Sequence, residues 1–198
     1  MPRGIRASGS SSGSSPSSDP EARARQICLR LLTAAPRTRA ELAAALGRRG
    51  VPGEAAEAVL GRFTDVGLID DAAFARAWVE SRHYSRGLSR RSLSAELRQH
   101  GVEPEEIREA VSTLDPEQEV ATARRLVEQK MAGTRGQPPE ARIRRAAGTL
   151  ARKGYPPGLV FRLIKEVLEQ EGPGQAVGLE LDPDSYLDPD ADPDDAIG

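Results

Sequence analysis

One short pattern occurs three times in this chain: a leucine, three residues, a glycine, an apolar or aromatic residue, and a proline nearby. The leucines are Leu46, Leu97 and Leu150, and the glycines are Gly50, Gly101 and Gly154. The glycines therefore stand 51 and 53 residues apart. A leucine four positions before a glycine, followed by proline, is how a helix ends, because glycine adopts the left-handed conformation and proline starts the next helix. The pattern predicts one helical unit used three times.

Helical periodicity continues between these helix ends. Apolar residues recur every three or four positions from residue 19 to residue 172, and no segment alternates long enough to make a strand. We therefore expect an all-α fold of three tandem three-helix units resembling helix-turn-helix motifs, at residues 19–70, 71–114 and 115–172. Stacked units of this kind should form an elongated or crescent body.

The two ends of the chain differ from this body in composition. Residues 1–18 are rich in Ser and Gly, and residues 173–198 are rich in Asp and Pro, with eight acidic side chains and no basic one. Neither end holds enough apolar surface to form a core, so both are predicted to be disordered. The acidic tail either keeps the protein soluble or folds back on the basic body and competes with a partner.

The body between the two ends is mildly basic. Residues 20–172 carry 26 basic and 21 acidic side chains, a formal net charge of +5, and the third unit is the most basic. This charge is a weak indication of a polyanion or an acidic protein as partner. An arginine-biased composition with solvated helix faces explains it equally well.

Several classes of function find no support in the sequence. The single cysteine, Cys28, excludes an internal disulfide, has no neighbouring histidine, and is expected to be a small buried or half-buried side chain. The chain has no phosphate-binding loop, no Cys-x-x-Cys pair and no His-Glu-x-x-His motif, so we expect no enzyme, no cofactor and no metal. No apolar run approaches membrane-spanning length and no leucine heptads occur, which predicts a cytoplasmic monomer without a membrane partner.

The most specific stretch joins the first and second units. It contains Ile-Asp-Asp at residues 69–71, Phe-Ala at 74–75, and Leu-x-x-Glu-Leu-x-x-x-Gly-Val at 93–102. This stretch resembles the RecX family, bacterial regulators of the RecA recombinase. The match is close over about 35 residues and extends loosely over residues 20–172 through the three-unit organisation. The signature positions are Asp70, Asp71, Phe74, Trp78, Leu93, Glu96, Leu97 and Gly101.

The resemblance implies a function. RecX proteins are tandem three-helix repeats that bind the RecA filament on single-stranded DNA, lie in its groove, and suppress ATP hydrolysis, strand exchange and filament growth. They have no known catalytic centre. The resemblance thus implies a role in homologous recombination, DNA repair and the SOS response. Two alternatives stay open: a DNA-binding protein of the helix-turn-helix type, and a helical-repeat scaffold for another partner.

The signature residues have structural explanations. Asp70 and Asp71 stand just before an amphipathic helix, where N-capping suits them better than acid–base or metal chemistry. Phe74 and Trp78 are four residues apart on one helix face, which favours core packing over stacking on a base.

The basic side chains are the candidate contact residues. They recur on corresponding helices of the second and third units, and Arg90 and Arg91 occupy a first helical turn, where a cation is unfavourable without an anionic partner. The candidates are Arg82, Arg86, Arg90, Arg91, Arg98, Arg142, Arg144, Arg145, Arg152 and Lys153. The alternative is an ordinary solvated surface. If the contact hypothesis holds, replacing Arg90 and Arg91 with Glu should weaken inhibition of RecA without unfolding the chain.

Overall fold

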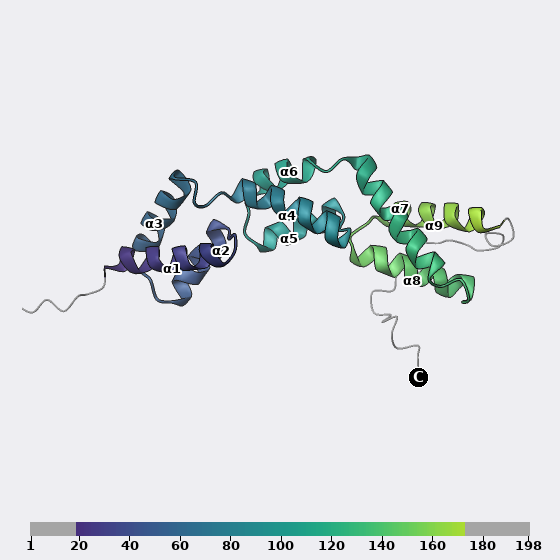
Figure 1. Ribbon diagram of the computed structural model, residues 1–198, viewed down its shortest axis with the longest axis horizontal. Helices are drawn as coiled ribbons and strands as arrows, with labels where there is room; N and C mark the ends of the chain where they lie inside the picture. Colours follow the sequence, from purple (N-terminus) through teal and green to yellow (C-terminus); the bar gives the residue numbers. More distant parts are fainter. Residues whose placement is uncertain (1–18, 173–198) are drawn as a thin grey trace, which may run out of the picture. The chain divides into compact units, whose positions relative to one another are not determined.

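The computed structural model describes residues 19–172, and the expectations for residues 1–18 and 173–198 lie outside this range. The described residues form nine α-helices and no strand, which confirms the all-α prediction (Figure 1). The helices are α1 (Pro20–Ala34), α2 (Arg39–Arg48), α3 (Gly53–Asp65), α4 (Asp71–Arg86), α5 (Arg90–Gln99), α6 (Pro104–Ser112), α7 (Pro116–Ala132), α8 (Pro139–Arg152) and α9 (Pro157–Glu171). We call α1–α3 repeat 1, α4–α6 repeat 2 and α7–α9 repeat 3.

The repeated leucine–glycine pattern is the end of the second helix in each repeat. After α2, Gly50 has φ +68°, its N–H donates to the carbonyl of Gly47 at 2.9 Å, and the Val51 N–H donates to the carbonyl of Leu46 at 3.2 Å. These two bonds define the Schellman motif, in which the residue after glycine also packs against the leucine. The same bonds follow α5 and α8, where the glycines have φ +74° and +82°. The predicted left-handed helix ends are confirmed.

The first helix of each repeat begins at an aspartate cap. The Asp19, Asp70 and Asp115 carboxylates accept hydrogen bonds of 3.1, 2.7 and 3.0 Å from backbone N–H groups in the first turns of α1, α4 and α7. A carboxylate there satisfies a donor that the helix leaves unpaired and interacts favourably with the helix dipole. Asp70 is therefore a cap, as predicted.

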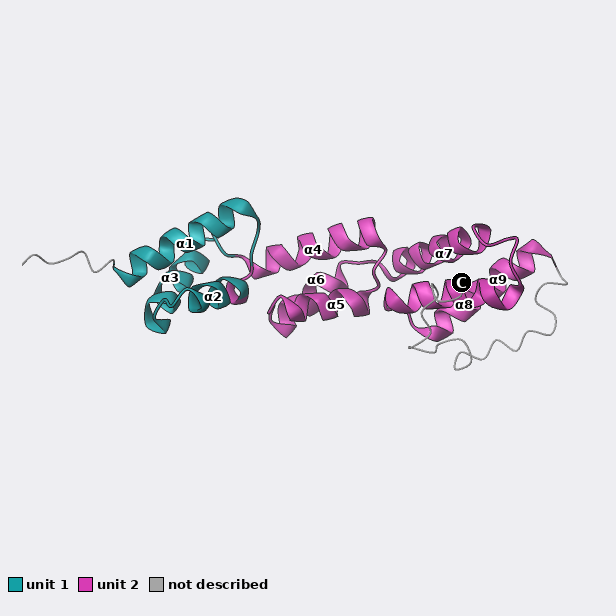
Figure 2. Ribbon diagram, turned by 90° about the horizontal axis from the view of Figure 1, so that it is seen from below, with its two compact units in different colours: residues 1–37, 41–69 teal, residues 38–40, 70–198 magenta. Residues whose placement is uncertain are grey.

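The chain divides into two compact units, drawn in different colours in Figure 2. Unit 1 comprises residues 1–37 and 41–69 and contains the core of repeat 1. Leu42, Leu46 and Leu60 are fully buried in that core. Cys28 is also fully buried there, as expected, and burial raises the pKa of its thiol.

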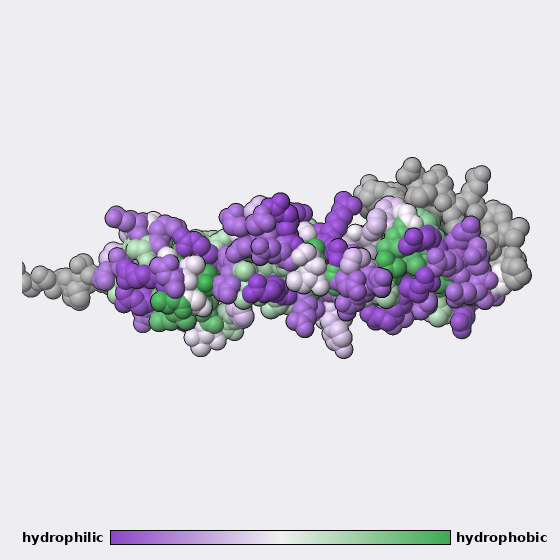
Figure 3. Space-filling view, turned by 90° about the horizontal axis from the view of Figure 1, so that it is seen from above, coloured by the Kyte–Doolittle hydropathy of each residue, from purple (hydrophilic) through white to green (hydrophobic). Residues whose placement is uncertain are grey.

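Unit 2 comprises residues 38–40 and 70–198 and contains two cores, one in each of repeats 2 and 3. Leu93 and Leu97 are fully buried in the core of repeat 2. The larger core, in repeat 3, includes the fully buried Ile143, Leu150 and Ile164. The face of the molecule seen in Figure 3 is mostly hydrophilic, with apolar residues in smaller patches.

Candidate partner-binding surface

Repeats 2 and 3 are joined by hydrogen bonds between the turn before α5 and the end of α8. The Ser89 N–H donates to the carbonyl of Lys153 at 2.9 Å, and the Tyr155 hydroxyl donates to the carbonyl of Gly87 at 3.1 Å. The Lys153 ammonium donates to the carbonyl of Arg86 at 2.5 Å. We call this contact, residues 86–92 against residues 153–155, the repeat 2–3 junction. It fixes the loop and first turn of α5 against the end of α8.

The junction is closely packed around Gly154. A Cβ atom at this position would lie 2.2 Å from the Ser92 Oγ and 2.6 Å from the Ser89 Oγ. Ser89 and Tyr155 are only 1% and 3% exposed. The third glycine of the repeated pattern therefore both ends a helix and allows two repeats to approach each other.

Further polar contacts extend the junction to α7. The ring of His83 lies 2.9 Å from the Leu88 carbonyl through Nδ1 and 3.1 Å from the Thr122 hydroxyl through Nε2. The Arg90 backbone N–H donates to the Glu119 carboxylate at 2.9 Å, and the Arg90 guanidinium lies 3.5 Å from the same carboxylate. The first turn of α5 thus has an anionic partner within the chain: the Glu119 carboxylate, which lies beside Arg90.

Four cations gather at the junction from three helices. Burial lowers the pKa of Lys153, and the positive charges of Lys130, Arg86 and Arg152 lower it further. We call these four residues the junction cation cluster. The three charged neighbours that lower the pKa of Lys153 are all cations, so the surroundings of its ammonium are positively charged.

The predicted contact residues divide into surface and interior positions. Arg86, Arg91, Arg98, Arg144 and Arg152 are exposed. Arg145 is half-buried and donates to the side-chain carbonyl of Gln137. The guanidinium of Arg82 lies 4.2 Å from the centre of the Trp78 ring and 3.9 Å from the Glu96 carboxylate.

Arg142 belongs to the interior of repeat 3. Its side chain is 3% exposed and donates to the Met131 carbonyl at 3.0 Å and to both oxygens of Glu171 at 2.9 and 2.7 Å. A buried guanidinium with these partners stabilises the ends of α7 and α9 and offers little to another molecule. We therefore exclude Arg142 from the candidate surface, as a correction to the sequence-based assignment.

The aromatic signature residues pack against the core of repeat 2, as predicted. Phe74 and Trp78 are stacked with ring centres 5.5 Å apart, and the Trp78 ring lies 4.2 Å from that of His100. The Trp78 indole N–H donates to the Glu96 carboxylate at 2.7 Å, which gives this signature glutamate a structural role.

Two further signature residues contact residues 38–40, which group with the same unit. The Asp71 carboxylate accepts a hydrogen bond of 2.9 Å from the Arg39 N–H. A Cβ atom on Gly101 would lie 2.4 Å from that of Ala40. Both residues therefore have structural roles.

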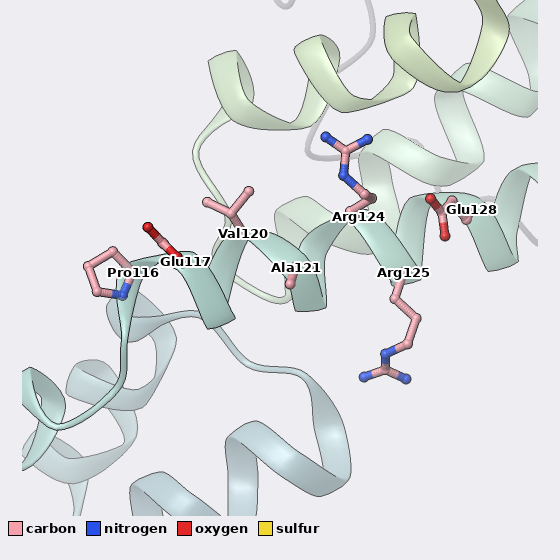
Figure 4. A pocket seen from close by; sticks show the side chains of 7 residues that line it. All are labelled: Pro116, Glu117, Val120, Ala121, Arg124, Arg125 and Glu128. Carbon is pink, nitrogen blue, oxygen red and sulfur yellow. The ribbon is translucent and has the colours of Figure 1, made fainter. Parts of the chain in front are cut away.

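A separate shallow hollow lies along α7 (Figure 4). Arg124 and Arg125 both line this hollow; the Arg124 side chain is ion-paired with Glu166 of α9, and the Arg125 side chain projects to the opposite side of α7. The hollow has none of the predicted contact residues in its lining.

No cluster of three or more His, Cys, Asp or Glu side chains within residues 19–172 could hold a metal ion. Likewise, none of the helices in this range is both long enough and apolar enough to cross a membrane.

Three family models cover most of the described chain. The models of the first, second and third three-helix domains of RecX match residues 24–63, 70–111 and 117–164. The chain is 60% identical to the regulatory protein RecX of Thermobifida fusca over 160 residues, which cover 81% of this chain and 86% of that protein. It is 59% identical to the regulatory protein RecX of Streptomyces coelicolor over 157 residues, 79% of this chain and 84% of the relative.

Solved structures show the same fold. A crystal structure of a regulatory protein RecX superposes with a TM-score of 0.65 at 26% identity, covering 75% of this chain and 72% of the other. RecX from Lactobacillus salivarius superposes with a TM-score of 0.68 at 17% identity, covering 75% and 97%. With three matching domain models and relatives of this similarity, the chain belongs to the RecX family.

Proposed function

We propose that this protein regulates the RecA recombinase, mainly as an inhibitor, by binding the RecA filament on single-stranded DNA. The observation that carries the proposal is the 60% identity to a regulatory protein RecX over 81% of the chain. In the proposed action the protein lies in the filament groove and suppresses ATP hydrolysis, strand exchange and filament growth. It acts in the cytoplasm as a monomer, in homologous recombination, DNA repair and the SOS response.

The tandem repeats suit a filament as partner. A filament presents the same surface at regular intervals, and similar repeats can meet successive copies of that surface. Repeats 2 and 3 are held together by hydrogen bonds to backbone carbonyls at the junction, so their contact groups keep a fixed spacing. A fixed spacing reduces the ordering entropy that binding would otherwise cost.

The junction cation cluster is the proposed centre of contact. Its exposed guanidinium groups, those of Arg86 and Arg152, can reach DNA phosphates or acidic side chains of the filament. Arg91, Arg98 and Arg144 are exposed as well and extend the proposed surface. Arg82 and Arg90 have partners within repeat 2 and at the junction, and we assign them supporting roles.

Direct binding of DNA without RecA is a second candidate function, favoured by the same cation cluster. A net charge of +5 over residues 20–172 is small for tight binding to DNA alone. Salt separates the two functions: binding driven by DNA phosphates falls steeply, with a log–log slope of roughly one per phosphate contacted. Binding that also uses protein–protein contacts with RecA should fall less steeply.

The proposed function is tested by titrating the full chain into RecA that hydrolyses ATP on single-stranded DNA at near-physiological salt. We expect inhibition well below one molecule per RecA monomer, because a block on filament growth affects many protomers. A folded chain, shown by circular dichroism, that leaves hydrolysis unchanged in stoichiometric excess would contradict the proposal.

A further inference from the structure

Repeat 2 has a groove of about 470 Å³ between α5 and α6. Its apolar lining, which we call the floor, contains Ile107, Val111 and Pro104, and Ser94 and Ser112 line the groove as well. Arginines from both helices stand on its rim, Arg90 and Arg98 from α5 and Arg108 from α6. An apolar floor with a cationic rim fits a segment that carries carboxylates interleaved with apolar side chains.

The rim arginines are available to a ligand to different degrees. Arg98 is exposed. Arg108 pairs with Glu105 of the same helix, but the two side chains are 71% and 69% exposed, so the pair is weak and easily exchanged. Arg90 is committed to Glu119 at the junction. Arg98 and Arg108 are therefore the two groups that a bound acidic segment would engage.

The chain itself contains such a segment beyond the described residues. Residues 173–198 carry eight acidic side chains and no basic one, and Tyr186 and Leu187 lie between Asp184 and Asp188. We propose that this C-terminal segment binds back into the α5–α6 groove of the same molecule, with its carboxylates on Arg98 and Arg108 and its apolar side chains on the groove floor.

The length of the segment permits this contact. α9 ends at Glu171, close to the Met131 end of α7, because Arg142 bonds to both residues. The path back to the far end of the groove follows α7 and then α5, helices of 17 and 10 residues, or about 40 Å in total. About 12 extended residues span that distance, so residues from about 186 onward can lie in the groove.

The consequence is regulation by charge. A bound acidic segment would cover Arg98, which belongs to the proposed contact surface, and would compete with any polyanion for it. Because the groove arginines are exposed, salt should weaken the contact. Binding of the C-terminal segment in the groove does not require RecA, so this contact can fail while regulation of RecA stands, and the reverse.

The test is paramagnetic relaxation in the full chain. A nitroxide is attached at Ala191→Cys in a Cys28→Ala background, and amide signals are recorded at low salt. We expect signals from residues 94–112 to lose more than half their intensity and to recover when Arg98 and Arg108 are replaced with Glu. The matched control replaces Arg76 and Arg162, two exposed arginines outside the groove, with Glu. In this control the signals of residues 94–112 should still lose intensity.

Three outcomes would overturn the proposal: no loss of signal, equal loss over the whole chain, or loss centred on the junction cation cluster. Signal loss that the groove variant does not reverse would also overturn it. Circular dichroism of each variant separates a failure to bind from a failure to fold, and Arg98→Gln with Arg108→Gln repeats the test if the Glu variant unfolds.

Discussion

Replacing Gly154 with Ala tests whether the junction holds repeats 2 and 3 together. Any residue with a side chain at φ +82° costs about 1–2 kcal/mol, because its Cβ approaches the backbone. At Gly154 the new Cβ would also lie 2.2 Å from Ser92 Oγ, 2.6 Å from Ser89 Oγ and 3.1 Å from Ser92 Cβ. The two hydroxyls can rotate, but the Ser92 Cβ can move only with its backbone.

The additional cost follows from the hydrogen bonds that must then change. The Ser89 hydroxyl caps α5 by accepting from the Ser92 N–H, and losing a cap costs about 1 kcal/mol. Moving the backbones apart also stretches the bond from the Ser89 N–H to the Lys153 carbonyl, worth about 1 kcal/mol. We expect Gly154→Ala to lower the free energy of unfolding by about 3–4 kcal/mol.

Gly50→Ala is the matched control. Gly50 ends the corresponding helix of repeat 1 with φ +68°, and a Cβ there would meet no atom within 4 Å. This variant should lose only about 1–2 kcal/mol. Urea unfolding followed by circular dichroism measures both variants, and the fluorescence of Trp78, the only tryptophan, reports on repeat 2. Equal losses in the two variants would refute the reasoning about the junction.

Three further predictions concern Tyr155, Arg142 and Asp70. Burial raises the pKa of Tyr155 to about 12, so the unfolded chain loses the hydroxyl proton at lower pH than the folded chain does. The free energy of unfolding should therefore fall by about 1 kcal/mol between pH 9.5 and 11. Tyr155→Phe should flatten this slope, and Tyr84→Phe, at an exposed site, should not. Arg142→Met leaves Glu171 without its buried partner and should cost about 2–4 kcal/mol in urea unfolding, whereas Arg124→Met, which breaks a half-exposed pair, should cost less than about 1 kcal/mol. Asp70→Ala removes the cap of α4 and should cost about 1 kcal/mol, while Asp70→Asn should cost less; equal losses would contradict the capping role.

The fold could be predicted because its signals are local. A Schellman motif needs a leucine, a glycine and an apolar residue at fixed spacing, and an aspartate before a first-turn proline marks a helix start. The structure has both features at the predicted residues, for example at Gly50 and Asp19. Each of these features is determined by residues a few positions apart in the sequence, so the sequence alone is enough to predict them.

The candidate surface could be predicted only in part, because it depends on which helices pack together. The charge of Lys130, on α7, acts on the pKa of Lys153 at the end of α8, and nothing in the spacing of these residues in the sequence indicates it. The pairing of Arg90 with Glu119 likewise joins residues 29 positions apart. The burial of Arg142, by contrast, could have been predicted, because residues 142, 146 and 150 lie at helical spacing and form one buried stripe of α8. The apolar residues at 146 and 150 were a signal that Arg142 faces the core.

The junction cation cluster is tested most directly by binding of the labelled chain to preformed RecA filaments on single-stranded DNA. One variant replaces Arg86, Lys130 and Arg152 with Gln, and leaves Lys153 in place because its ammonium bonds to the Arg86 carbonyl. The control replaces three exposed arginines elsewhere, Arg25, Arg76 and Arg162. Three lost contacts of about 0.5–1 kcal/mol each should weaken binding by tenfold or more, with the control within about twofold of the unmodified chain. Equal affinities for the cluster variant and the control would contradict the account.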